Sequence, residues 1–93
     1  MSLLNYSYPL NESWTTKEIV DVVNYYSFIE KAYEKGIKQQ DLILAYNRFK
    51  QIVPSKSEEK QLDREFEKQS GYVPYRVIKY AKDQNATDLV KMK

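Results

Sequence analysis

The sequence predicts a small all-α single domain, a bundle of about four helices. Three observations indicate this fold class. Four stretches carry apolar residues at the three- and four-residue spacing of an amphipathic helix, with capping or turn residues between them. No stretch shows the strict alternation of a half-buried strand. A chain of 93 residues has room for one hydrophobic core.

The composition excludes several classes of function. Cysteine and histidine are both absent, which removes disulfides, thiolate nucleophiles, cysteine-based zinc sites and imidazole bases. The formal net charge of +2 is too small to indicate nucleic-acid binding by itself. No apolar run is long enough to span a membrane, and residues 1–6 lack the pattern of a secretory signal. We expect a cytoplasmic, non-enzymatic protein without a cofactor, a metal or a catalytic site.

The two ends of the chain differ from its middle. Residues 1–14 have no helical period but are rich in aromatic rings, which bury large apolar areas. We therefore expect them to form an aromatic arm packed on a helical domain of residues 15–83. Residues 84–93 are polar and aperiodic, and we expect a frayed tail.

The first helix is predicted from Thr15 to Lys35. Thr15 can cap the amide of Glu18, and the Glu18 carboxylate can bond back to Thr15, which together form a capping box. Gly36 follows, as is common where a left-handed residue ends a helix. Glu30 lies about 20° from Ile19 on the helical wheel, inside the flank of the apolar face, where such a side chain more often reaches solvent or a lysine than becomes buried. The apolar face consists of Ile19, Val22, Val23, Tyr26, Ile29 and Tyr33.

The second helix is predicted from about Gln39 to Val53, because Pro54 cannot continue the hydrogen-bond ladder. The short connection at residues 36–38 predicts that the first two helices are antiparallel neighbours. The apolar face of the second helix consists of Leu42, Ala45, Tyr46, Phe49, Ile52 and Val53.

The last two helices have smaller apolar faces. A capping box at residues 55–58 opens the third helix, which closes near residues 70–71. Its apolar stripe is essentially Leu62 and Phe66, so we expect it to be the most exposed helix. The fourth helix is predicted from about Pro74 to Asp83. Its inward side chains are predicted to be Tyr75, Ile78 and Ala81, with Val77 beside them.

Several separated blocks of the chain resemble a known family. Residues 52–66 read IVPSKSEEKQLDREF, and SGY at 70–72 and YRV at 75–77 follow them. The opening has YSYPL at 6–10 ahead of WTTKEIV at 14–20. Together these blocks resemble the YktA-like family of small uncharacterised proteins of low-GC Gram-positive bacteria. The resemblance implies an all-helical cytoplasmic protein, and it assigns no catalytic or binding residue.

Two features are candidates for a protein-interaction surface. Phe28 and Leu44 are large apolar residues on the polar sides of their helices, which indicates either a second buried layer or a contact surface. The partner at such a surface is an unknown protein or a second copy of this chain. The third helix also carries a row of cations, which is either a charged docking ridge or a solvated face. The row consists of Lys56, Lys60, Arg64 and Lys68.

Other polar residues suggest weaker alternatives. Glu59 and Asp63 could share a divalent ion, but two carboxylates on an exposed helix leave most ligand positions to water, so no metal site is expected. The last quarter of the chain mixes aromatic rings with cations, namely Tyr72, Tyr75, Arg76, Lys79, Tyr80 and Lys82. Such a mixture can stack bases beside phosphate contacts, although tyrosines packed in a small core give the same pattern. We predict a non-enzymatic protein–protein interaction module, with weak nucleic-acid binding as the alternative.

Overall fold

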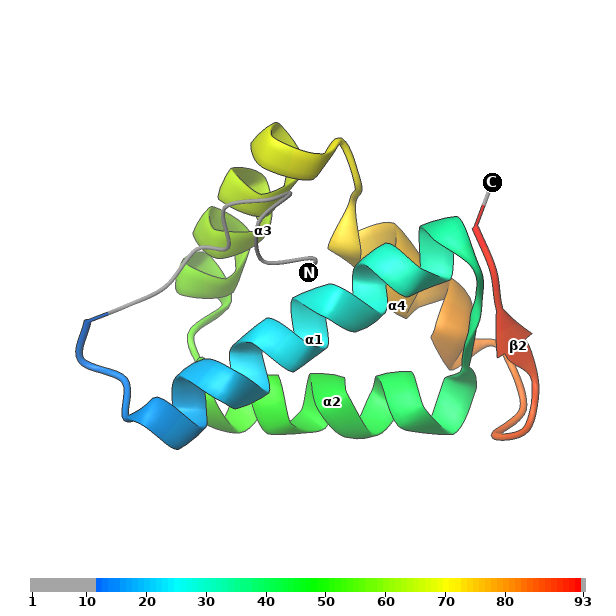
Figure 1. Ribbon diagram of the computed structural model, residues 1–93, viewed down its shortest axis with the longest axis horizontal. Helices are drawn as coiled ribbons and strands as arrows, with labels where there is room; N and C mark the ends of the chain where they lie inside the picture. Colours follow the sequence, from blue (N-terminus) through cyan, green and yellow to red (C-terminus); the bar gives the residue numbers. More distant parts are fainter. Residues whose placement is uncertain (1–11, 93) are drawn as a thin grey trace.

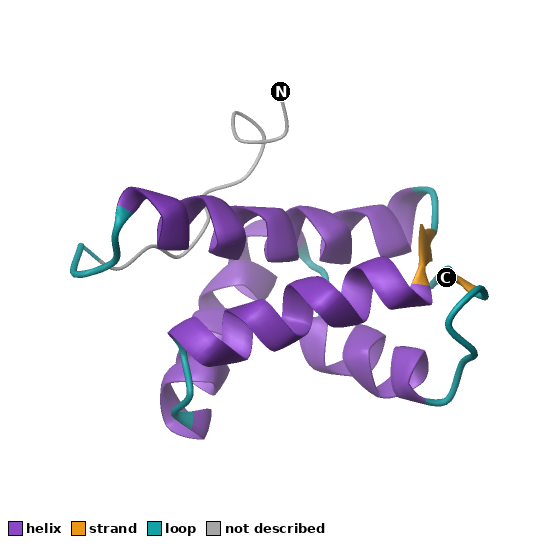
Figure 2. Ribbon diagram, turned by 90° about the horizontal axis from the view of Figure 1, so that it is seen from below, coloured by secondary structure: helices purple, strands orange, loops and turns teal. Residues whose placement is uncertain are grey.

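The computed structural model describes residues 12–92, and helices dominate it (Figure 1). The elements in chain order are α1 (Thr16–Glu34), β1 (Ile37–Lys38), α2 (Gln39–Ile52), α3 (Lys56–Ser70), α4 (Pro74–Lys82) and β2 (Leu89–Val90). α1 and α2 lie side by side and run in opposite directions, as the short connection between them predicts (Figures 1 and 2). α3 rises steeply from the end of α2, and α4 then packs behind both α1 and α2. The predicted all-α fold class is confirmed, with one very small sheet added.

Local sequence signals set the helix ends. The amide of Glu18 donates to the Thr15 hydroxyl at 3.1 Å, and the Thr15 amide donates to Glu18 Oε1 at 2.8 Å, so the first predicted capping box is present. Ser55 caps α3 by accepting a bond from the amide at position 58. Gly36 and Gly71 follow α1 and α3 with φ angles of 98° and 80°, a left-handed backbone that suits glycine.

Aromatic rings form the centre of the core. Tyr25 of α1 stacks on Phe49 of α2, with ring centroids 4.5 Å apart and planes inclined by 19°. Tyr26, the next residue, packs against Phe66 of α3 at 4.6 Å. α1 therefore reaches α2 and α3 with two successive rings. Leu62 and Phe66 are the buried side chains of α3, as its thin apolar stripe predicts.

The segment after α4 contains a strand and a backbone bond to α1, a difference from the polar, aperiodic tail expected for residues 84–93. β2 pairs antiparallel with β1, and this register places the fully buried Val90 opposite Ile37. Beyond the strand, the amide of Met92 donates to the carbonyl of Ala32 at 2.7 Å. Strands of two residues are too short to show an alternating pattern, so periodicity could not reveal them. The predicted arm lies outside the described residues except for residues 12–14, where Trp14 is buried.

α4 turns a different face inward than predicted. Tyr75 is 68% exposed, whereas Pro74 and Val77 are buried together with the predicted Ile78 and Ala81. The buried set has the i, i+3, i+4, i+7 spacing of a helix face, and it leaves the polar end of Tyr75 outside the core. None of the helices described has the length and hydropathy that crossing a bilayer requires.

We predict that Val90→Ala destabilises the protein although Val90 lies in the segment expected to fray. The substitution removes two buried methyl groups at about 0.8 kcal/mol each, so the free energy of unfolding should fall by about 1.5 kcal/mol. Urea denaturation measures this change. The neighbouring exposed Leu89 provides a matched control, because Leu89→Ala should change stability by less than about 0.5 kcal/mol. Equal effects of the two substitutions would contradict the buried strand pair.

Candidate functional site

A groove between α1 and α2 brings together the two apolar residues that the sequence placed on polar helix faces. Its volume is about 340 Å³. Phe28 is partly buried and packs against the core, whereas Leu44 is 68% exposed, so no described element covers it as a second layer. The lining residues are Asp21, Asn24 and Phe28 of α1, and Asp41, Leu44, Ala45 and Arg48 of α2. The four cations of the α3 row are exposed and line no part of this groove.

The two ends of the groove differ in charge. At one end Arg48 Nε donates to Asp21 Oδ2 at 2.7 Å, an ion pair that joins the start of α1 to the end of α2. Asp41 lies in the first turn of α2, is exposed, and forms no ion pair with another described residue. Lys31 Nζ lies 5.3 Å from the ring of Phe28. The groove thus combines the apolar side chains of Phe28, Leu44 and Ala45 with one neutralised ion pair and one exposed carboxylate.

A second cavity, of about 170 Å³, is lined by side chains from all four helices. Its lining residues are Tyr25, Tyr46, Glu59, Asp63, Tyr75, Ile78, Lys79 and Lys82. The cavity brings together two groups from the sequence analysis. Glu59 and Asp63 are the two carboxylates that could share a divalent ion, and Tyr75, Lys79 and Lys82 belong to the aromatic and basic last quarter. Sequence reasoning did not bring these groups together. Among residues 12–92 no three acidic side chains gather into a metal-binding group.

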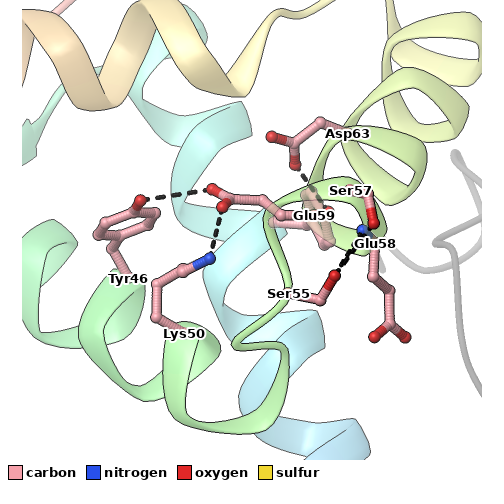
Figure 3. Close-up of polar contacts among 8 residues, drawn as sticks. Tyr46, Lys50, Ser55, Ser57, Glu58, Glu59 and Asp63 are labelled. Carbon is pink, nitrogen blue, oxygen red and sulfur yellow. Dashed lines mark hydrogen bonds and ion pairs between the residues drawn. The ribbon is translucent and has the colours of Figure 1, made fainter.

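Tyrosine hydroxyls and a lysine hold the two carboxylates on the inner side of α3. Lys50 Nζ donates to Glu59 Oε1 at 2.6 Å, and the Tyr46 hydroxyl donates to Glu59 Oε2 at 3.3 Å (Figure 3). The Tyr26 hydroxyl donates to Asp63 Oδ1 at 2.9 Å. These bonds link α3 to α1 and α2, beside the buried Leu62 and Phe66.

The sequence contains a pattern that indicates the inward placement of both carboxylates, and this pattern was not used in the sequence analysis. Glu59 and Asp63 complete an i, i+3, i+4, i+7 set with Leu62 and Phe66, which is the spacing of a buried helix face. Glu30 was likewise expected at the edge of its apolar face and is instead buried, with 3% of its surface exposed. It lies four residues after Tyr26, on the row of α1 that faces the core.

The tyrosines and cations of the last quarter have separate roles. The ring of Tyr72 stacks on Tyr33 at 4.5 Å with planes inclined by 8°, and its hydroxyl donates to Glu34 at 2.9 Å. That contact occupies a ring face which base stacking would need. Tyr80 and Arg76 are exposed, and Tyr75, Lys79 and Lys82 line the cavity.

Comparison with known proteins places the chain in a family. A sequence model described as "Uncharacterised protein family (UPF0223)" matches residues 5–90. The chain belongs to the UPF0223 family. It is 54% identical to the UPF0223 protein YktA of Bacillus subtilis, over 86% of this chain and 91% of the relative. It is 51% identical to a UPF0223 protein of Oceanobacillus iheyensis, over 92% and 98% of the two chains.

Family membership confirms the resemblance to YktA-like proteins and leaves the activity open. A third UPF0223 relative, from Bacillus mycoides, is 49% identical over 96% of this chain and 100% of its own length. The match extends to residue 90, so it includes the strand β2 that follows α4. The names of these relatives state no activity, ligand or partner.

In this UPF0223 member, burial around the cavity shifts the pKa values of the Asp63 carboxyl group and of three tyrosine phenols. The pKa of Asp63 is raised to about 7: burial raises it most, the hydrogen bond from Tyr26 lowers it, the charge of Glu59 raises it and the charge of Lys50 lowers it. Burial, followed by the nearby Glu59, raises the pKa of Tyr46 to about 12. Burial also raises the pKa values of Tyr25 and Tyr26. The phenols therefore stay protonated at neutral pH, where Asp63 is close to half-titrated.

We predict that Asp63→Asn stabilises the protein, and more so at pH 8 than at pH 5. The folded-state pKa of Asp63, about 7, lies above the ordinary aspartate value of 3.8, so protonation favours the folded state and that stabilisation is lost as the pH rises through about 7. Asparagine keeps an oxygen for the Tyr26 bond and carries no charge. The gain should grow by about 1–2 kcal/mol between the two pH values, measured by urea denaturation.

The exposed Glu65 on the same helix supplies the control. Glu65→Gln should change stability by less than about 0.5 kcal/mol at both pH values. A gain from Asp63→Asn that is the same at pH 5 and pH 8 would contradict a raised pKa at Asp63.

Proposed function

We propose that this protein is a non-enzymatic interaction module that binds an amphipathic helix of a partner protein in the α1–α2 groove. The observation that carries the proposal is the exposure of Leu44 in the groove that Phe28 also lines. An exposed leucine next to a partly buried ring offers apolar area that a partner can remove from water. Two antiparallel helices also provide a straight groove into which the apolar face of a third helix packs.

The surroundings of the groove indicate the chemistry of the partner helix. Val20 is 50% exposed and lies two turns before Phe28 on the same row of α1, so a further apolar side chain lies beyond Asn24 on this row. Asp41 supplies an exposed carboxylate without an ion-pair partner among the described residues. We therefore expect apolar partner side chains at helical spacing and a lysine or arginine that meets Asp41.

The chemistry of the cavity supports a non-enzymatic role. Raised pKa values keep the phenols of Tyr25, Tyr26 and Tyr46 protonated at neutral pH, which disfavours their use as bases or nucleophiles. The chain also lacks histidine and cysteine, the side chains that most often serve those roles near neutral pH.

We predict that Leu44→Lys abolishes partner binding without unfolding the protein. Capture from a nuclease-treated Gram-positive lysate, followed by cross-linking and mass spectrometry, measures both retention and the contact segment. The substitution should lower retention of a groove-bound partner by about tenfold or more, because it places a charge among the apolar side chains of the groove. The exposed Asn47, one turn along α2, gives a matched control, since Asn47→Lys adds the same charge outside the groove.

The outcomes separate this proposal from its competitors. Support requires that the cross-linked segment be an amphipathic helix with a basic residue, lost in Leu44→Lys and kept in Asn47→Lys. A dimer of the purified protein that Leu44→Lys dissociates in sedimentation would make a second copy the occupant. Partners that vanish with nuclease, and a single-stranded RNA affinity that falls steeply with salt, would favour nucleic-acid binding. A partner retained equally by the unsubstituted protein, Leu44→Lys and Asn47→Lys would exclude the groove as its binding site.

A further inference from the structure

The second cavity contains paired groups of opposite charge that the proposed interaction surface does not use. α3 contributes the carboxylates of Glu59 and Asp63, and α4 contributes the ammonium groups of Lys79 and Lys82. The cavity and the α1–α2 groove share no lining residue. We propose that this cavity binds a small zwitterion, a molecule that carries one ammonium group and one carboxylate.

Asp63 is the group best placed for the ligand ammonium. Both oxygens of Glu59 already accept bonds, from Lys50 and Tyr46. Asp63 accepts the Tyr26 bond through Oδ1, and its Oδ2 accepts no bond from a described residue. Figure 3 shows the carboxylates of Glu59 and Asp63 on successive turns of α3. An ammonium group at this position gains a charge-assisted hydrogen bond and a second nearby carboxylate.

Tyr25 and Lys79 supply the part of the lining that suits the carboxylate of the ligand. The Tyr25 side chain is buried and lines the cavity, and burial raises the pKa of its phenol, so the hydroxyl stays protonated as a donor at neutral pH. A ligand carboxylate can accept from this hydroxyl and from the ammonium group of Lys79. The opposite charges on α3 and α4 then orient the two ends of the ligand.

The remaining lining suits the short carbon chain of such a ligand. Tyr46, Tyr75 and Ile78 supply two rings and an aliphatic side chain. Lys82 Nζ lies 5.5 Å from the centre of the Tyr46 ring, which shows that this aromatic face accommodates an ammonium group. A volume of about 170 Å³ restricts the ligand to a small molecule.

Titration of the ¹⁵N-labelled full chain with defined probes tests the proposal. Glycine, 4-aminobutyrate and 6-aminohexanoate span three separations between ammonium and carboxylate. At least one should cause saturable shifts of amide signals in α3 and α4. Butylamine and butyrate are the controls for 4-aminobutyrate, because each lacks one of its two charged groups. The controls for glycine and 6-aminohexanoate are the amine and the acid of matching chain length. For the zwitterion that binds, each single-charge analogue should bind about tenfold more weakly or worse, because one charged hydrogen-bonded group is lost.

Substitutions locate the site. Asp63→Asn and Lys79→Gln should each weaken binding by about tenfold, whereas Glu65→Gln and Lys60→Gln, at exposed α3 residues, should leave it unchanged. Leu44→Lys should also leave it unchanged, so this proposal and the groove proposal can fail separately. No saturable shift with any zwitterion, or an amine that binds as tightly as its zwitterion, would overturn the proposal.

Discussion

In addition to the bonds that Glu59 accepts from Tyr46 and Lys50 of α2, α3 is held in position by Tyr26 of α1. Its ring packs on Phe66 at 4.6 Å, and its hydroxyl donates to Asp63 at 2.9 Å. α3 buries little else, since Leu62 is its only other buried side chain among the described residues. Asp63 lies where water is largely excluded, and this burial raises its pKa to about 7 although the Tyr26 bond lowers it. Tyr26 therefore contacts both the aromatic core and a carboxylate of the cavity.

α2 connects the two candidate surfaces because neighbouring residues point to different sides of a helix. Leu44 and Ala45 line the groove, and Tyr46 lines the cavity on the other side. The groove is an apolar surface with one anionic end, which suits an amphipathic helix. The cavity is enclosed by rings and by charges of both signs, which suits a small molecule. A chain of 93 residues thus presents two sites of different chemistry around one aromatic core.

Much of the fold could be predicted from local signals. The capping box at Thr15, the left-handed Gly36 and the ring-bearing faces of the first two helices all depend on residues close together in the chain. The β1–β2 pair was missed because each two-residue strand has one buried side chain, Ile37 or Val90, and the two strands are far apart in sequence. The cavity was missed for a related reason: a helical wheel of α3 places Asp63 on the buried face, but it does not contain the hydroxyl of another helix that donates to Asp63.

Native-state hydrogen exchange on Tyr26→Phe tests the dependence of α3 on this side chain most directly. The substitution keeps the ring packing and removes the hydroxyl bond to Asp63. At neutral pH the amides of Leu62 and Phe66 in α3 should lose about tenfold or more protection relative to that of Phe49 in α2, because α3 then opens locally. Equal loss of protection in the two helices would contradict a specific role for the Tyr26 hydroxyl in holding α3.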